Sequence, residues 1–141
     1  MDLNKIFGLF SGGSEDHKIN ENLSEFKKSP YYKIGMFKKL IMNGLNFKKS
    51  VLGMFSSSLN DIDLKDVDLM GEFMMYHRGW YWLEQLDISD PEYIKDIKTS
   101  SDPDLLVALK LCINYFEEQE EYEKCAFLKK IQDFVEESLE V

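Results

Sequence analysis

The chain has 141 residues, of which 44% are apolar and 30% are charged, a composition that fits one folded domain and excludes a disordered chain. The formal charge of −9 is unevenly placed: nine basic and five acidic residues give +4 in positions 1–58, whereas eight basic and 21 acidic residues give −13 in positions 59–141. An acidic surface repels a phosphate backbone, so the second half excludes nucleic acid as its partner and favours a basic protein.

Residues 1–29 are expected to form a flexible N-terminal arm. The first ten residues place apolar side chains at helical spacing, namely Leu3, Ile6, Phe7 and Phe10, before SGGSED interrupts the pattern. This pattern predicts a short amphipathic peptide on a linker, and one further short helix is expected over 20–27. Phe7 and Phe10 are candidate anchors for a groove on a partner. The alternative is a terminal segment that packs on its own domain or frays.

Residues 30–141 are expected to form one helical domain, and its first part is basic. Ser29-Pro30 favours a helix start, and Asn43-Gly44 suits a left-handed C-terminal cap, so we expect one helix to end near residue 42 and another to cover 46–59. The lysines of 31–58 suit a membrane surface or nucleic acid, but ordinary solvated helices carry the same density, so membrane binding is disfavoured. The basic half can instead contact the acidic half of this chain or of a second subunit.

A long central helix is predicted after the SSSLND loop, with its start capped by Asp61 or Asp63. One apolar stripe runs through Leu69, Phe73, Tyr76, Trp80 and Leu83, and an adjoining side carries Met70, Met74, His77 and Tyr81. The size of these side chains predicts that they anchor the core. Gly71 and Gly79 lower helix propensity by about 1 kcal/mol each, which favours close packing or a kink near them.

The C-terminal residues 101–139 predict an antiparallel helical hairpin. Asp102 and Pro103 suit a helix start, and the following apolar residues form one stripe, at Leu105, Ala108, Leu109, Cys112, Ile113 and Phe116. Four glutamates within residues 117–121 repel one another in a helix, so a turn is expected there. The second helix resumes near Tyr122. It has apolar residues on two sides, the first formed by Tyr122, Cys125 and Ala126 and the opposite one by Phe127, Leu128, Ile131, Phe134, Val135 and Leu139. We therefore expect it to contact the first helix with its beginning and another element with its end.

The run EEYEKCAFLKKI in this hairpin resembles the UVR motif, the short helical hairpin of excision-repair nuclease subunits and of adaptors to Clp-type unfoldases. The matching places are Tyr122, Glu123, Ala126, Leu128 and Lys129, and the resemblance covers residues 105–135. Lys130 and Ile131 depart from the family pattern. The resemblance implies a contact between hairpins, with another copy or with a partner, and it implies no chemistry.

No catalytic residue, metal site or cofactor is predicted. His77 has Glu72 and Glu84 nearby in sequence, but no nucleophile pairs with them, so a structural histidine is preferred to a general base. Zinc-ligand spacings and phosphate-binding glycine loops do not occur. The acids from Asp61 to Asp68 resemble a calcium loop in composition only, and helix capping explains them more simply.

The expected compartment is the reducing cytoplasm. Cys112 and Cys125 fall on apolar stretches, which favours small reduced core residues over a disulfide. No stretch is long and apolar enough to span a bilayer, and the first residues do not fit a secretory signal.

These patterns together predict a non-enzymatic protein–protein interaction module: an adaptor, a scaffold or an assembly component. The Lys, Asn and Ile usage suits an AT-rich microbial or viral genome, which is compatible with a subunit of a phage particle or a secretion machine. A homo-oligomer is compatible with these patterns as well. The candidate contact residues are Phe7, Phe10, Glu117, Glu118, Glu120, Glu121, Tyr122 and Glu123. Three alternatives stay open: an immunity- or antitoxin-like protein that neutralises a basic toxin, an enzyme that uses His77, and a peripheral membrane protein that binds through residues 1–58.

Overall fold

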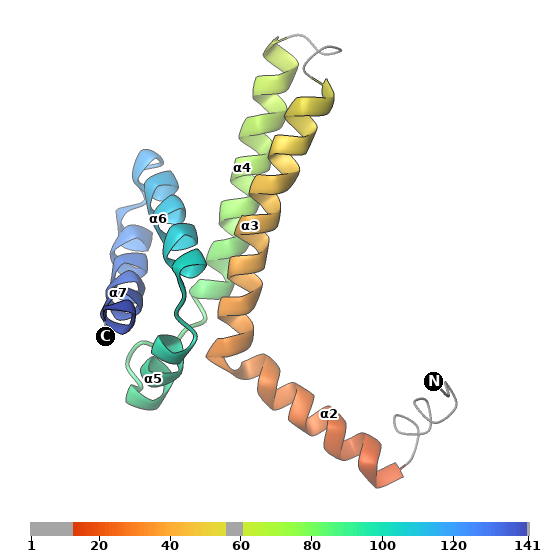
Figure 1. The fold of residues 1–141 in the computed structure, drawn as a ribbon, viewed down its shortest axis with the longest axis vertical. Helices are drawn as coiled ribbons and strands as arrows, with labels where there is room; N and C mark the ends of the chain where they lie inside the picture. Colours follow the sequence, from red (N-terminus) through yellow and green to blue (C-terminus); the bar gives the residue numbers. More distant parts are fainter. Residues whose placement is uncertain (1–12, 56–60, 141) are drawn as a thin grey trace.

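The computed structural model describes residues 13–55 and 61–140, and within these ranges the chain forms six α-helices and no strand (Figure 1). In chain order they are α2 (Gly13–Lys28), α3 (Pro30–Phe55), α4 (Asp61–Leu83), α5 (Pro91–Thr99), α6 (Pro103–Glu118) and α7 (Tyr122–Leu139). The predicted all-α fold, a small helical bundle with a C-terminal antiparallel hairpin, is confirmed. The predicted N-terminal peptide with Phe7 and Phe10 lies outside the described residues.

The N-terminal arm contains a longer helix than the predicted 20–27, because α2 already begins at Gly13. Ring contacts tie its last turn to the body: the ring centroid of Tyr32 lies 5.9 Å from that of Phe26 and 5.5 Å from that of Trp82. Otherwise α2 projects away from the rest of the molecule (Figure 1). Its three large apolar side chains, Ile19, Leu23 and Phe26, are consequently exposed.

The helices α3 and α4 pack side by side as a long antiparallel pair (Figure 1). The predicted break at Asn43-Gly44 is wrong, because α3 continues through it as one helix. Gly44 serves close packing and not capping, since a Cβ atom there would lie 2.3 Å from Met75 Sδ. The predicted close packing is confirmed at Gly79, where a Cβ atom would lie 3.1 Å from the ring of Phe37. At Gly71 a Cβ atom would meet nothing within 4 Å.

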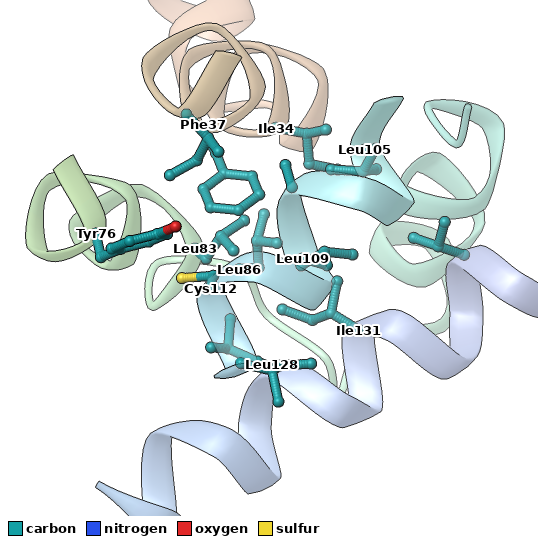
Figure 2. Packing of buried hydrophobic residues seen from close by; sticks show 14 of the residues in the cluster. Ile34, Phe37, Tyr76, Leu83, Leu86, Leu105, Leu109, Cys112, Leu128 and Ile131 are labelled. Atoms are coloured by element: carbon teal, nitrogen blue, oxygen red, sulfur yellow. The ribbon is translucent and has the colours of Figure 1, made fainter. Parts of the chain in front are cut away.

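The core lies where the inner halves of α3 and α4 meet the α6–α7 hairpin (Figure 2). The predicted start of α6 is confirmed, because the Asp102 carboxylate accepts a hydrogen bond of 2.8 Å from the Leu105 N–H. The whole predicted stripe of α6 is buried: Leu105, Ala108, Leu109, Cys112, Ile113 and Phe116. In Figure 2, α6 lies between Phe37 of α3 and Leu128 of α7, so it is the central helix of the core.

The helix α7 uses one buried stripe and not two opposite sides. Cys125, Leu128, Ile131 and Val135 are buried. The expected contact of the beginning of α7 with α6 is confirmed at Cys125, whose Sγ lies 3.7 Å from the Ile113 carbonyl oxygen, but Tyr122 and Ala126, predicted to share that side, are exposed. The expectation that the end of α7 contacts another element is confirmed. Ser138 Oγ donates a 2.8 Å hydrogen bond to the carbonyl of Lys98 at the end of α5.

The prediction that the large side chains of the α4 stripe anchor the core is confirmed only for the second half of the helix. Tyr76 and Leu83 are buried, but the side chain of Leu69 is 64% exposed and that of Phe73 is 56% exposed. The adjoining methionines, Met70 and Met74, are exposed as well. Figure 1 gives the reason: the α6–α7 hairpin covers the inner half of α4, and the outer half extends beyond it.

Candidate protein-interaction surfaces

The outer segment, which we define as residues 44–55 of α3 and 61–75 of α4, projects from the body of the molecule (Figure 1). Six of its large apolar side chains are exposed: Phe47, Val67, Leu69, Met70, Phe73 and Met74. At 100° per residue, Leu69 and Phe73 lie on one side of α4, and Val67 and Met74 lie roughly opposite. A helix that is apolar on all sides is normally covered on all sides. The outer segment therefore has apolar surface that this chain leaves uncovered.

Two adjoining hollows open between α3 and α4, one on this segment and one that extends from it toward the body of the molecule. They share four lining residues, Gly44, Phe47, Gly71 and Met75. The outer hollow, of about 90 Å³, is completed by Lys48, Val67, Asp68 and Glu72. The inner hollow, wider at about 500 Å³, is completed by Met36, Lys39, Leu40, Asn43, Met74 and Arg78. The missing side chain of Gly71 leaves part of this space, because nothing lies within 4 Å of its Cβ position, whereas Met75 occupies the position beside Gly44.

The two hollows differ in charge. In the outer hollow, Lys48 Nζ lies 2.8 Å from Asp68 Oδ1 and 2.7 Å from Glu72 Oε1, so one cation faces two carboxylates. Partial burial lowers the pKa of Lys48, but the hydrogen bonds and negative charges of the two acids outweigh it and raise that pKa. In the inner hollow, Lys39 and Arg78 have no carboxylate partner among the described residues. The outer hollow is thus net negative and the inner hollow net positive.

The acidic tip, which we define as residues 117–123, is the turn between α6 and α7. The Glu121 N–H donates a 2.9 Å hydrogen bond to the Phe116 carbonyl and the Glu120 N–H a 3.0 Å bond to the Glu117 carbonyl. This pattern is a Schellman motif, with Glu120 in the left-handed conformation at φ 59° where glycine is usual. The tip brings together all six predicted contact residues of the turn, Glu117, Glu118, Glu120, Glu121, Tyr122 and Glu123, and Tyr122 is 65% exposed.

Two lysines of α7 partly neutralise the tip. Lys129 Nζ lies 3.0 Å from a Glu117 oxygen, and Lys124 Nζ lies 3.8 Å from a Glu121 oxygen. The tip nevertheless keeps five glutamates against these two lysines, so it remains an acidic surface with one exposed aromatic ring.

His77 lies among aromatic side chains. Its ring centroid is 4.2 Å from that of Phe73 and 5.4 Å from that of Phe116. Burial lowers the pKa of His77, and the nearby Lys124 cation lowers it further. Glu72, a predicted neighbour, binds Lys48 instead. This surrounding supports the expected structural histidine.

The two thiols are also placed as expected for core residues. Cys112 and Cys125 are both buried and unpaired. Burial raises the pKa of Cys112 to about 12, which keeps its thiol protonated and unreactive at neutral pH. Among the described residues, no three His, Cys, Asp or Glu side chains are grouped so that they could hold a metal ion.

The sequence prediction missed the hollows of the outer segment. Their floor depends on Gly44 and Gly71, which are 27 positions apart in the chain and meet only because α3 is continuous. One signal was present: residues 67–74 carry apolar side chains on opposite sides of the helix, more than one core contact can use.

In the part of the chain that the structure describes, no helix has the length and apolarity needed to cross a membrane. Nothing in the structure tests the resemblance of residues 105–135 to the UVR hairpin, which stays a prediction. Comparison with protein-family models, with curated proteins and with solved structures finds no match to this chain.

Proposed function

We propose that this chain is a non-enzymatic protein–protein interaction module, an adaptor, scaffold or assembly component that binds a protein through its outer segment. The observation that carries the proposal is the group of six exposed apolar side chains on α3 and α4, with Phe47 71% exposed. Three of the six, Phe47, Val67 and Met74, line the hollows between α3 and α4, and exposed apolar surface around a hollow marks interaction sites in folded proteins. A reducing cytoplasmic compartment suits the two buried thiols.

The outer segment is also held in shape before any partner arrives. Met75 fills the space beside Gly44, and Lys48 joins α3 to Asp68 and Glu72 of α4. A surface whose backbone is already ordered loses less conformational entropy on binding than a loop does. The hollows are therefore suited to receive a side chain from a partner without rearrangement.

The test uses two matched glycine variants. Gly71→Trp fills the shared floor of the hollows, and Gly35→Trp places the same side chain on α3 outside them; neither Cβ atom meets a neighbour within 4 Å. Affinity capture with chemical cross-linking from the native host should recover a partner with the unaltered chain and with Gly35→Trp, and lose it with Gly71→Trp. Identical recovery with both variants, or no partner with the unaltered chain, would overturn the proposal.

A second candidate function is neutralisation of a basic partner by the acidic tip, as in an immunity or antitoxin protein. The observation that favours it is the exposed ring of Tyr122 among five glutamates. Electrostatic steering would make association with a basic partner slow markedly as salt rises. Tyr122→Ala should raise the dissociation rate, whereas Glu118→Lys should lower the association rate. A salt-independent association rate would reject this function.

A further inference from the structure

We infer that the protein which fills the hollows of the outer segment is a second copy of this chain. Two outer segments pack antiparallel about a twofold axis, so that α3 and α4 of both copies form a four-helix bundle. The inference rests on the proposed function, because it names the partner of that same site. A twofold contact requires a surface that complements itself, so that each copy offers both the projecting group and the space that receives it.

The first reason is steric. Phe47 is the most exposed large apolar side chain among the described residues, and it lines both hollows. Directly beside it, the position above Gly71 is empty. In knobs-into-holes packing, the ring of Phe47 would be the knob and the hollow beside Gly71 would be the hole, and both lie on the same surface of this chain. A twofold axis near the four shared lining residues lets Phe47 of each copy enter the hollow of the other.

The second reason is electrostatic and sets the direction of the helices. Along the helix pair, the outer hollow carries Lys48 with Asp68 and Glu72 and is net negative. The inner hollow carries Lys39 and Arg78 and is net positive. Antiparallel pairing about an axis between the hollows places each outer hollow against the inner hollow of the other copy, whereas parallel pairing would place like charges together.

The third reason is that the exposed apolar stripe of α2 does not reach the hollows of its own chain. The α2 stripe of Ile19, Leu23 and Phe26 is the competing occupant for the hollows. Figure 1 shows α2 leaving the base of α3 in a direction away from the outer segment, so it does not reach the hollows of its own chain. Pairing of outer segments, in contrast, covers apolar surface on both copies with one reciprocal contact.

The test is the molar mass of the intact chain in solution, measured by sedimentation equilibrium from low micromolar to submillimolar concentration. The unaltered chain should approach twice the monomer mass as concentration rises. Phe47→Ser and Gly71→Trp should each raise the dimer dissociation constant by about 30-fold or more, as loss or blocking of a central aromatic anchor does. The matched controls, Gly35→Trp and Phe26→Ser, should leave it unchanged, and unaltered circular dichroism will show that each variant is folded.

Two results would overturn the inference. The first is a monomer at every concentration, which leaves the proposed function standing because capture of a different partner tests that separately. The second is a dimer that Phe26→Ser abolishes and Phe47→Ser does not, which would assign the contact to α2. If both the dimer and the captured partner are missing, the inference and the proposed function fail together.

Discussion

The α6–α7 hairpin and the outer segment of α3 and α4 are both antiparallel helix pairs with strong apolar periodicity, yet they differ in what covers them. On α6, all six residues of the apolar stripe are buried, because α3 lies on one side and α7 on the other. On the outer half of α4, Leu69 and Phe73 belong to an equally regular stripe and remain more than half exposed. Apolar periodicity therefore predicts which face of a helix is apolar, but the length of the neighbouring helices decides whether this face is buried.

The largest expected effect comes from truncating the same residue type in the two regions. Leu109→Ala, at a fully buried position of α6, should lower the free energy of unfolding by about 2–5 kcal/mol. Leu69→Ala, at a position 64% exposed on α4, should change it by less than about 0.5 kcal/mol. Urea unfolding followed by circular dichroism measures both. If both variants lost the same free energy of unfolding, Leu69 would be buried in solution, and the exposed outer half of α4 would be contradicted.

A second comparison uses the two glycines of α4. Gly79→Leu should lower the free energy of unfolding by about 1–3 kcal/mol, because its Cβ already approaches the buried ring of Phe37 at 3.1 Å. Gly71→Leu should not destabilise the chain, since nothing lies within 4 Å of its Cβ position and leucine favours the helix. Thermal unfolding of the two variants should therefore shift in different directions. A shift of the same size and sign would contradict the packing of α3 against α4.

A third prediction concerns the turn that joins the two helices of the C-terminal hairpin. Glu120→Gly should raise the free energy of unfolding by about 1 kcal/mol, because glycine adopts the left-handed conformation at φ 59° without a Cβ penalty. Glu118→Gly, two positions earlier at the last residue of α6, is the control and should destabilise the chain. Urea midpoints measure the difference, and a loss of stability with Glu120→Gly would argue against this turn.

The smallest expected effect is the pH dependence at the border between the two regions, where His77 contacts Phe73 and Phe116. Burial first and Lys124 second lower the pKa of His77 in the folded state below its ordinary value of 6.5, although Glu121 opposes them. Between these two pKa values the unfolded chain binds more protons, so stability falls as the pH drops below 6.5. His77→Gln should flatten this part of the pH profile. If the pH dependence of stability were the same in His77→Gln as in the unaltered chain, His77 would be solvated and its pKa would not be lowered by burial.

Local sequence signals accounted for the start of α6, its buried face and the turn that follows it. Asp102 caps α6 through its own side chain, and the repulsion of neighbouring glutamates coincides with the observed turn at 119–121. The same kind of signal failed at Asn43-Gly44, because a glycine inside a helix and a glycine after its end look alike in sequence. Only the approach of Met75 from α4 distinguishes the two uses.

By itself the sequence determined the helical class, the capped start of α6, the acidic turn and the buried stripe of α6, because these depend on interactions within a few residues of one another. The tertiary structure alone decided that α3 is continuous, that the outer half of α4 stays uncovered and that two distant glycines floor one pair of hollows. These features arise from contacts between residues far apart in the chain, and the spacing of apolar residues along one helix carries no information about where its neighbour ends.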